Sequence, residues 1–367
     1  MTGQDEAPKS RLAPIRARTG GGVGHALLGS TALAVGGLWA TAFAGAWLDR
    51  PPIPMVLVLT GLPLIAPVLT AAAFAFWTLF PDHRLGAPVM AVAALGPLLW
   101  WGPVWAGRPG DAQPDDVVVL DWNVRRLWGA PGDGGDPLAC VTDAVRAAAA
   151  DVVVLQEVTP RDLDRLSDAL GLRCVHGTYH PDDDDDSAGI AVCAGSDRWT
   201  LREGGPTPYP DASDWRFVRA AFGTPDATAF SVLGVHLHPY RVLHDPQRAL
   251  ERAADRVPVV VPSQDAQTTD LLEQWLALPE PTLVAGDFNS TRDTPFHARL
   301  RRHLTDVLEA TGAGFPATVD LLDGLPIRID FVYASPKMAP VQAAVLDAGC
   351  SDHRPILSRL RPPPSTR

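Results

Sequence analysis

The sequence predicts an α/β domain that follows an N-terminal region of three membrane-spanning helices. Residues 23–48, 53–80 and 86–106 are long apolar stretches without Asp, Glu, Lys or Arg. From residue 116 onward, short Val-rich runs of the kind that form buried strands alternate with segments of helical periodicity. This alternation is typical of an α/β or α+β domain, and the pattern alone does not choose between the two.

Each apolar stretch has about 20 residues or more, enough to cross a bilayer core of roughly 30 Å. Tryptophans gather near their ends, as they do at membrane surfaces; they are Trp39, Trp47, Trp77, Trp100, Trp101 and Trp105. An alternative is a cleaved signal sequence followed by a hydrophobic core, because residues 41–44 (TAFA) resemble a cleavage site of small residues. The two further stretches of spanning length favour three helices.

Basic residues precede the first apolar stretch; they are Lys9, Arg11, Arg16 and Arg18. Because the cytoplasmic ends of membrane helices are enriched in Lys and Arg, we expect residues 1–22 to form a cytoplasmic arm. Three helices over residues 23–107 then place a linker, 108–115, and a folded domain, 116–362, outside the cytoplasm. The sequence thus predicts a multi-pass protein of the cell membrane with an extracytoplasmic domain.

Strands and helices are expected to alternate through this domain. Strands are expected at 116–123, 151–156, 173–179, 188–194, 215–222, 229–236, 282–286, 328–334 and 355–360. Helices are expected at 137–149, 161–170, 246–256, 267–277 and 295–302. Clusters of Pro and Gly predict a linker at 107–114 and loops at 129–137 and 204–210.

Polar residues follow the apolar runs at the points where the expected strands end. They are Asn123, Glu157, His236, Asp287, Asn289, Asp330, Asp352 and His353. A rigid sheet can aim groups at its strand ends into one cleft, where catalytic residues commonly gather. Carboxylates, amides and imidazoles together equip a Mg²⁺-dependent phosphoester hydrolase. The sequence therefore predicts an enzyme.

Six short strings carry a resemblance to a known family. They are WNV, LQEV, VHLHP, GDFNST, RIDFVYAS and SDHRPI, in that order between about residues 117 and 360. With them the chain resembles the endonuclease/exonuclease/phosphatase superfamily, whose type case is deoxyribonuclease I. The resemblance implies a four-layer α/β/β/α sandwich and metal-dependent hydrolysis of a phosphoester. The first hundred residues lie outside it.

Phosphoester hydrolysis requires charge neutralisation at the phosphoryl oxygens, an activated water and stabilisation of the leaving oxygen. Glu157, a carboxylate at a strand end, is the best candidate ligand for Mg²⁺ or Mn²⁺. The resemblance assigns Asn123 to metal and phosphate binding, and Asp352 would complete the metal shell. The structural alternatives are an ordinary capping or surface acid at Glu157 and a turn residue at Asn123.

Asp287 and Asn289 are two residues apart, so an extended segment would point both to the same face. The roles that the resemblance implies for them are to orient or deprotonate the attacking water and to donate an amide N–H to a phosphoryl oxygen. An Asx turn between a strand and a helix would use the same residue types.

His236 and His353 supply imidazoles that can stabilise a developing phosphorane oxygen or protonate the leaving group. Asp330 is expected to orient His353 by accepting its ring N–H. Relatives similar to deoxyribonuclease also have an acid that orients the first histidine; here Tyr179 or an acid of the run Asp182–Asp186 lies in the right region. We otherwise expect that run to be a solvated loop, with a calcium site as the alternative.

The charge of the domain bears on its substrate. Residues 109–367 hold 24 Lys and Arg against 38 Asp and Glu, a formal charge of −14, and Lys337 is their only lysine. A non-specific nuclease gains affinity by neutralising phosphates, so this balance disfavours nucleic acid as a partner. Arginine patches such as Arg125-Arg126 leave a nuclease or nucleotide phosphodiesterase as an alternative.

The expected substrate is a small phosphorylated molecule or a lipid-linked phosphate. Three spans followed by an outward-facing domain look like the teicoplanin-resistance membrane proteins of actinomycetes. That likeness of architecture implies a lipid (pyro)phosphate of the cell envelope. A third alternative is a non-catalytic binding module tethered to the membrane.

The four cysteines are Cys140, Cys174, Cys193 and Cys350, and none is in a CxxC motif that would indicate structural zinc. Outside the cytoplasm a disulfide is permitted, and Cys174 and Cys193 could face one another across a hairpin. Otherwise all four are small buried hydrophobic residues, and Cys350 is expected to serve packing.

Overall fold

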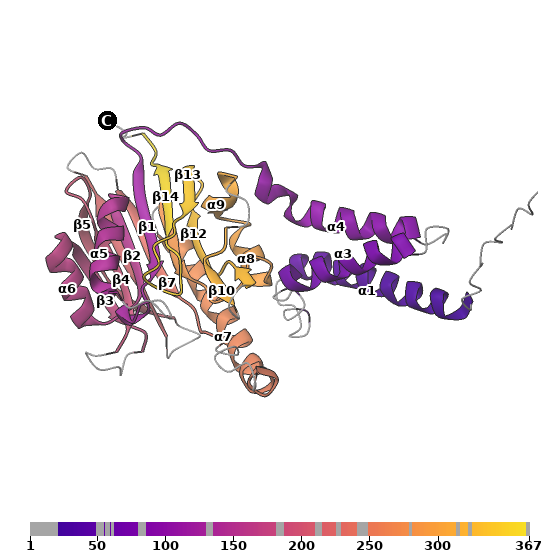
Figure 1. Ribbon diagram of the computed structural model, residues 1–367. Helices are drawn as coiled ribbons and strands as arrows, with labels where there is room; N and C mark the ends of the chain where they lie inside the picture. The colour runs from indigo at the N-terminus through magenta and orange to yellow at the C-terminus, as the bar shows by residue number, and fades with distance from the viewer. Residues whose placement is uncertain are drawn as a thin grey trace, which may run out of the picture.

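The structure is a computed structural model. It describes residues 21–48, 55, 59, 62–79, 86–129, 135–180, 187–209, 215–224, 229–240, 249–278, 281–312, 316–321 and 325–364. Two parts are visible in Figure 1: a bundle of three helices and a larger α/β domain whose two sheets pack face to face.

The first sheet has the strand order β13-β14-β1-β2-β4-β3. Its strands are β1 (Val117–Asn123), β2 (Val152–Val158), β3 (Arg173–Thr178), β4 (Gly189–Ala194), β13 (Ala339–Val345) and β14 (Ile356–Arg361). The second sheet has the order β5-β6-β7-β8-β12-β9. Its strands are β5 (Thr200–Pro208), β6 (Arg216–Gly223), β7 (Ala229–His236), β8 (Thr282–Asp287), β9 (Thr305–Asp306) and β12 (Asp330–Ala334). A small hairpin joins β10 (Val319–Leu321) to β11 (Leu325–Ile327).

Helices cover the outer faces of both sheets. Those against the first sheet are α5 (Pro137–Ala148) and α6 (Pro160–Leu170). Those against the second are α7 (Ala249–Ala277) and α8 (Pro295–Leu300), while α9 (Val307–Ala310) and the 3-10 turn η1 (Arg125–Leu127) are short. The four-layer α/β/β/α sandwich expected from the resemblance is therefore confirmed (Figure 1).

The alternation of side chains along β1 explains the layering. Val117 and Val119 pack in the core between the two sheets, and Val118 and Leu120 pack beneath the helices of the first sheet. Because successive side chains of a strand point to opposite faces, a strand buried on both faces is apolar throughout. This is why VVVL reads as a continuous apolar run.

Two expectations for the domain are wrong. The loop expected at 204–210 lies mostly in β5, an edge strand where Pro206 and Pro208 need not donate to a second neighbour. The helices expected at 246–256 and 267–277 are one continuous helix, α7, with Pro258 and Pro262 inside it. Val257 and Val261 lie in the part of α7 between the two expected helices; both are buried, and Tyr240 packs against them.

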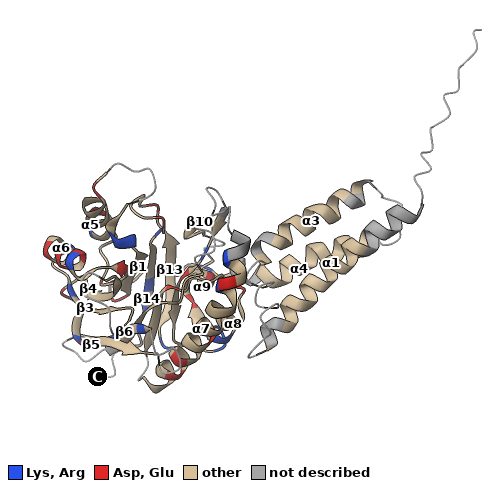
Figure 2. Ribbon diagram, turned by 90° about the horizontal axis from the view of Figure 1, so that it is seen from below, with Lys and Arg blue, Asp and Glu red and all other residues tan. Residues whose placement is uncertain are grey.

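The three expected membrane spans coincide in position with α1 (Gly21–Trp47), α3 (Leu62–Leu79) and α4 (Gly86–Ala106). None of these helices contains a charged residue, and in Figure 2 charged residues gather on the α/β domain. Within the described ranges, no helix has both the length and the apolar character needed to cross a membrane. The expectation of spanning helices is not confirmed.

Both pairs of cysteines are disulfides. Cys174 and Cys193 occupy directly paired positions on β3 and β4, which confirms the hairpin pairing. Cys140 of α5 is joined to Cys350, although the sequence suggested only packing for Cys350. The alternative of four free buried cysteines is therefore wrong. The run Asp182–Asp186 lies outside the described residues.

Candidate active site

The ends of strands from both sheets meet at one end of the sandwich. Asn123 ends β1 of the first sheet, and Asp287 ends β8 of the second. The Asn123 amide donates to Asp287 Oδ2 at 3.1 Å and to Glu157 Oε1 at 3.3 Å, so it bridges the sheets. In the second sheet, Asp287 is paired in register with both His236 and Asp330. The expected residues of the two sheets are thus brought together.

Glu157 occupies an irregular position on β2. The pairing of β2 with β4 shifts between Gln156 and Val158, and Glu157 has a positive φ of 53°. A bulge of this kind re-aims a side chain at a strand end, and a non-glycine residue in the left-handed region is held there by its surroundings. Here the Glu157 backbone N–H donates to the Tyr179 hydroxyl at 2.7 Å. The fold therefore fixes Glu157 beside Asn123.

Close backbone approach sets the position of Asp287. Gly286 has a φ of 151°, and a Cβ there would lie 1.9 Å from the Val235 carbonyl oxygen of the neighbouring strand. Only glycine fits this position. The next turn is closed by the Asn289 N–H, which donates to Asp287 Oδ1 at 2.7 Å, while the Asn289 side chain donates to the Leu237 carbonyl at 2.9 Å.

Asp287 and Asn289 therefore form the Asx turn that the sequence left as an alternative, and this turn lies within the cluster. Burial, followed by repulsion from Asp330, raises the pKa of Asp287 to about 7. The opposing influences of His353, the Asn289 N–H and Asn123 are smaller. A carboxylate with such a pKa is suited to accept a proton near neutral pH.

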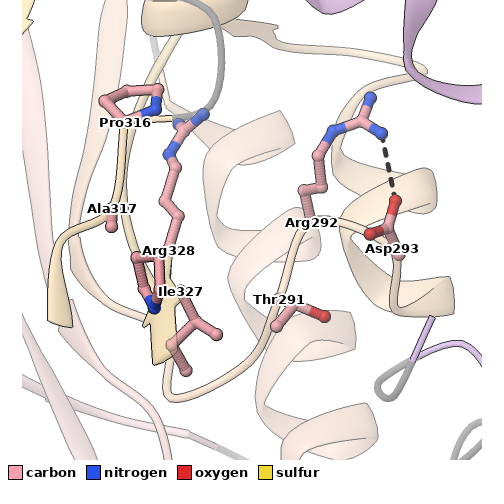
Figure 3. A pocket seen from close by; sticks show the side chains of 8 residues that line it. Thr291, Arg292, Asp293, Pro316, Ala317, Ile327 and Arg328 are labelled. Carbon is pink, nitrogen blue, oxygen red and sulfur yellow. Dashed lines mark hydrogen bonds and ion pairs between the residues drawn. The ribbon is translucent and has the colours of Figure 1, made fainter. Parts of the chain in front are cut away.

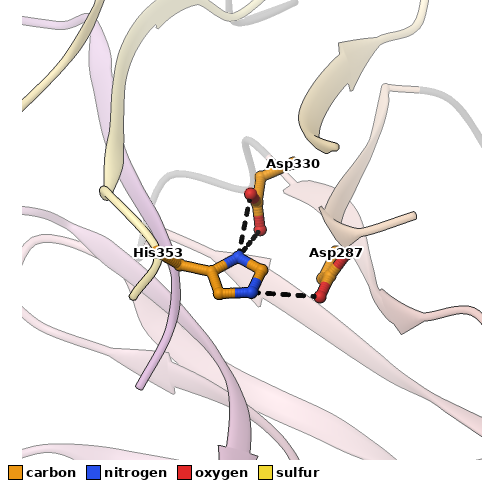
Figure 4. A group of neighbouring side chains, drawn as sticks. All are labelled: Asp287, Asp330 and His353. Carbon is orange, nitrogen blue, oxygen red and sulfur yellow. Dashed lines mark hydrogen bonds and ion pairs between the residues drawn. The ribbon is translucent and has the colours of Figure 1, made fainter. Parts of the chain in front are cut away.

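His353 is held by a carboxylate, as expected. Its Nδ1 lies 3.0 Å from Asp330 Oδ2, and its Nε2 lies 3.7 Å from Asp287 Oδ2 (Figure 4). Burial lowers the pKa of His353, but the negative charges of Asp330 and Asp287 outweigh it and raise the pKa to about 10. His353 is consequently a protonated imidazolium at neutral pH.

His236 is held by a phenol in place of a carboxylate. Its Nδ1 lies 2.6 Å from the Tyr179 hydroxyl, and its Nε2 lies 3.6 Å from Asp287 Oδ2. Burial, reinforced by the charge of Glu157, raises the pKa of Tyr179 well above its usual range, so the phenol keeps its proton. Of the two candidates considered for orienting His236, Tyr179 makes the contact, whereas the Asp run lies outside the described residues.

Two sets of residues offer metal ligands. In the described part of the chain, one group of His and acidic residues has its ligand atoms within 4.8 Å of one another: Asp287, Asp330 and His353. His353 Nδ1 lies 3.0 Å from Asp330 Oδ2, so this nitrogen of the imidazole already has a carboxylate partner. We therefore assign the group to proton handling. Glu157 and Asn123 carry the hard oxygen donors that Mg²⁺ prefers; in the structure the Asn123 amide nitrogen faces Glu157, and Asn123 Oδ1 accepts from the Arg125 N–H at 3.0 Å.

Asp352, the third expected metal ligand, has partners of its own. Its side chain is exposed, accepts from the Ser351 hydroxyl at 3.2 Å and pairs with Arg125 at 3.4 Å. Its role in a metal shell stays a prediction.

Several residues that support the site gave no clear signal in the sequence. The Thr318 hydroxyl accepts from the Asp330 N–H at 3.2 Å, and the Ser351 hydroxyl donates to the Asn123 carbonyl at 2.8 Å. Asp121 and Gln156 are bonded to one another at 2.8 Å on β1 and β2, and burial raises the pKa of Asp121 well above its usual range. Polar residues inside the apolar runs VVVLDWN and VVVLQEV were the available signal.

The family of the chain is shown by comparison. The pattern of the Endonuclease/Exonuclease/phosphatase family matches residues 122–353, and the chain belongs to that family. Its members are typically hydrolases that act on phosphoester bonds. No curated protein sequence matches the chain.

Solved structures share the fold. A functionally unknown conserved protein from Enterococcus faecalis V583 is 18% identical with a TM-score of 0.53, over 67% of this chain and 100% of its own. An endonuclease/exonuclease/phosphatase from Bacteroides vulgatus is 16% identical with a TM-score of 0.53, over 67% and 98%. D. rerio TDP2, complexed with a single-strand DNA product, is 18% identical with a TM-score of 0.51, over 67% and 99%. At these identities the likeness establishes the fold alone.

Proposed function

We propose that the protein is a metal-dependent hydrolase of a phosphoester, with Mg²⁺ as the metal. The observation that carries the proposal is the convergence of Asn123 and Glu157 with His236, Asp287 and His353 at one end of the sandwich. Bound at Glu157 and Asn123, Mg²⁺ would neutralise charge on the phosphoryl oxygens. The family supports the reaction class.

The residues divide the proton chemistry between them. Asp287, with its pKa near 7, accepts a proton from the attacking water. Asn289 lies beside it; its amide donates one N–H to the Leu237 carbonyl at 2.9 Å, and the second N–H would donate to a phosphoryl oxygen. The His353 imidazolium, held by Asp330, stabilises charge that develops on the phosphoryl group or the leaving oxygen. His236 donates its Nε2–H to another of these oxygens while Tyr179 holds its Nδ1.

We further propose an extracytoplasmic location, with the N-terminal helices attached to a membrane. Two disulfides support this location, because structural disulfides persist in oxidising compartments. The three uncharged helices expose large apolar side chains such as Leu33, Val68 and Leu99, which favours an apolar surrounding. A small or lipid-linked (pyro)phosphate of the cell envelope is the substrate that fits this setting and the acidic domain.

A nucleotide phosphodiesterase is the second candidate. Trp128 is 67% exposed, and the Arg126 guanidinium lies 5.6 Å from its ring. Both follow Asn123 closely in the chain, and an exposed aromatic ring beside an arginine can stack on a nucleobase. The negative charge of residues 109–367 opposes a long nucleic acid but not a mononucleotide.

The test is an assay of the full-length protein in detergent, with Mg²⁺ or EDTA. Substrates are a polyprenyl pyrophosphate, a panel of nucleotides and plasmid DNA. We expect Mg²⁺-dependent phosphate release from the lipid and a loss of about 10²-fold or more in Glu157→Gln, which keeps the shape of the ligand but not its charge. Turnover of nucleotides or nicking of DNA that Glu157→Gln abolishes would favour the second candidate. Activity that EDTA leaves intact, or no turnover of any substrate, would contradict the proposal.

Attachment and location have their own test. The full chain should stay in the membrane pellet after an alkaline wash, and external protease should reach the domain in cells stripped of their wall. Release of the chain by alkali would overturn membrane attachment, and protection from the protease would overturn the extracytoplasmic location.

A further inference from the structure

The last helix of the N-terminal bundle is hydrogen-bonded to the segment that carries the candidate water-activating residues. Trp100 Nε1 on α4 donates to Asp293 Oδ1 at 2.6 Å, and Trp101 Nε1 donates to the same carboxylate oxygen at 3.3 Å. Asp293 is only 2% exposed and follows Asn289 by four residues. The bundle therefore contacts the continuation of the turn formed by Asp287 and Asn289.

A chain of charged contacts leads from Asp293 into the domain. Arg292 Nη1 lies 3.0 Å from Asp293 Oδ1 (Figure 3), and Arg292 Nε lies 2.5 Å from Glu309 Oε1 on α9. All three side chains are largely buried. Because a buried ion pair must keep its geometry to offset desolvation, these contacts fix the segment against α9. The segment is held from the helix bundle on one side and from α9 on the other.

Residues 328–330, which lead into β12, are also fixed by buried contacts of an arginine. Arg328 donates to both carboxylate oxygens of Asp306 at 2.7 and 2.8 Å, and its Nε donates to the Asp330 carbonyl at 3.2 Å. Arg292 and Arg328 line the same small cavity of about 60 Å³ (Figure 3). The two segments that carry Asp287 and Asp330 thus run side by side next to the bundle.

A second and separate contact seats the end of α4. A Cβ at Gly107 would lie 2.3 Å from the Glu309 carbonyl oxygen. A Cβ at Gly312, whose φ is 72°, would lie 2.1 Å from the Gly107 carbonyl oxygen. Backbone meets backbone here, so α4 has one close fit against the turn after α9. The position of Trp100 relative to Asp293 is therefore set by the fold at two independent points.

From these contacts we infer that Trp100, supported by Trp101, is a positioning residue for the reaction centre. It acts through Asp293 on residues 287–294, so the N-terminal helices help to set the geometry of Asp287 and Asn289 in addition to attaching the domain. The inference rests on the proposed hydrolase function. Misplacement of a reacting group by about 1 Å can cost about 10²-fold in rate, so a partial loosening should be measurable.

Two substitutions of Trp100 in the full-length chain separate the hydrogen bond from the packing. Trp100→Phe keeps a large ring against Trp39 and Phe43 but removes the N–H. Trp100→His removes the second ring but keeps a nitrogen at the same position of the five-membered ring, where it can donate. We expect kcat to fall about tenfold in Trp100→Phe and less than about threefold in Trp100→His. The Mg²⁺ concentration for half-maximal activity should not change in either, because Glu157 lies on the other sheet.

Trp39→Phe is the matched control, since Trp39 packs in the same aromatic group and has ring contacts with Trp100 and Trp101. It should leave kcat unchanged. Rates are expressed per folded molecule, with folding measured by near-ultraviolet circular dichroism. If Trp100 had only a structural role, both substitutions would lower the melting temperature, but the kcat of Trp100→Phe would not differ from that of Trp100→His.

Equal kcat values for Trp100→Phe, Trp100→His and wild type would overturn the inference, as would an equal loss in both substitutions or a matching loss in Trp39→Phe. A wild-type protein without activity would instead contradict the proposed function. The two failures are therefore distinguishable.

Discussion

The two histidines of the site are held by chemically different partners. His353, from the first-sheet side, has a carboxylate at 3.0 Å, whereas His236, at the end of β7, has a phenol at 2.6 Å. Both approach Asp287 Oδ2 through Nε2, at 3.7 and 3.6 Å. The two imidazoles therefore make similar contacts to Asp287 through Nε2, but their Nδ1 atoms have chemically different partners.

The difference teaches how one fold can make two roles from one residue type. A carboxylate behind an imidazole stabilises its charged form, so His353 is a fixed cation at neutral pH. A protonated phenol fixes the orientation of His236 without supplying a full negative charge. We expect His353 to contribute a positive charge and His236 to contribute an N–H donor of fixed orientation.

The largest effect should come from exchanging each histidine for glutamine. His353→Gln removes a buried cation aimed at the reacting group, so we expect kcat to fall about 10³-fold. His236→Gln keeps an amide that can donate a hydrogen bond, so its kcat should fall less, by about tenfold to 10²-fold. Steady-state kinetics of the two full-length variants measure the ratio. A greater loss at position 236 would reverse the assignment of roles.

Asp330→Asn tests the source of the charge and should lower kcat about 10²-fold. Its pH profile should move as well. His353 is protonated below its raised pKa, so the activity and stability that depend on its charge are lost as pH rises through about 10. Asp287 must be ionised to accept a proton, so activity rises with pH through about 7.

Because Asp330 raises both pKa values, its removal should shift both limbs of the profile to lower pH. Asn at position 330 keeps the size of the side chain, so the fold should survive, which circular dichroism checks. Limbs that stay in place would show that Asp330 does not set these protonation states.

Tyr179→Phe addresses the other histidine and should have a smaller effect, a fall in kcat of about tenfold. The variant keeps the ring packing on His236 but loses the hydroxyl that contacts His236 and the Glu157 backbone. Since the phenol carries no charge, the pH limbs should not move. If Tyr179→Phe shifted the alkaline limb as much as Asp330→Asn does, the proposed difference between the roles of His236 and His353 would be contradicted.

The smallest effect is expected from Arg125→Ala, which frees Asp352 next to His353. The pair is partly exposed, so its loss should change stability by less than about 1 kcal/mol. If Asp352 completes the metal shell, its release should lower the Mg²⁺ concentration for half-maximal activity about two- to threefold. An unchanged Mg²⁺ dependence would count against Asp352 as a ligand and leave the metal to the Glu157 side. Arg146→Ala, at another exposed pair, is the control.

Much of the sandwich could be predicted because its strands are buried on both faces and read as continuous apolar runs. β5 could not, since REGGPTP has the composition of a loop and is a strand only because β6 pairs with it. β13 was missed for a related reason: all but one of its residues are exposed or half-buried, so no apolar run marks the strand. Tertiary pairing, which a local pattern does not contain, decided both.

The residues of the candidate site likewise differ in whether a local sequence pattern identifies them. Asn123, Glu157, Asp287 and His353 stand directly after or before apolar runs and could be identified, and the Asp330 pairing with His353 is as expected. The partner of His236 could not be chosen from the sequence, because Tyr179 is 57 residues away and meets it only when the two sheets pack. The Cys140–Cys350 bond, with a sequence separation of 210, had no local signal for the same reason.

That second disulfide also carries a consequence for timing. Cys350 stands three residues before His353, and its bond to Cys140 anchors the start of that segment to α5. A newly made chain in a reducing environment lacks this anchor, so the segment that carries His353 is held only by non-covalent contacts such as the one to Asp330. If the proposed hydrolase needs this anchor for full activity, oxidation of the two thiols would set a delay between synthesis of the chain and its first turnover.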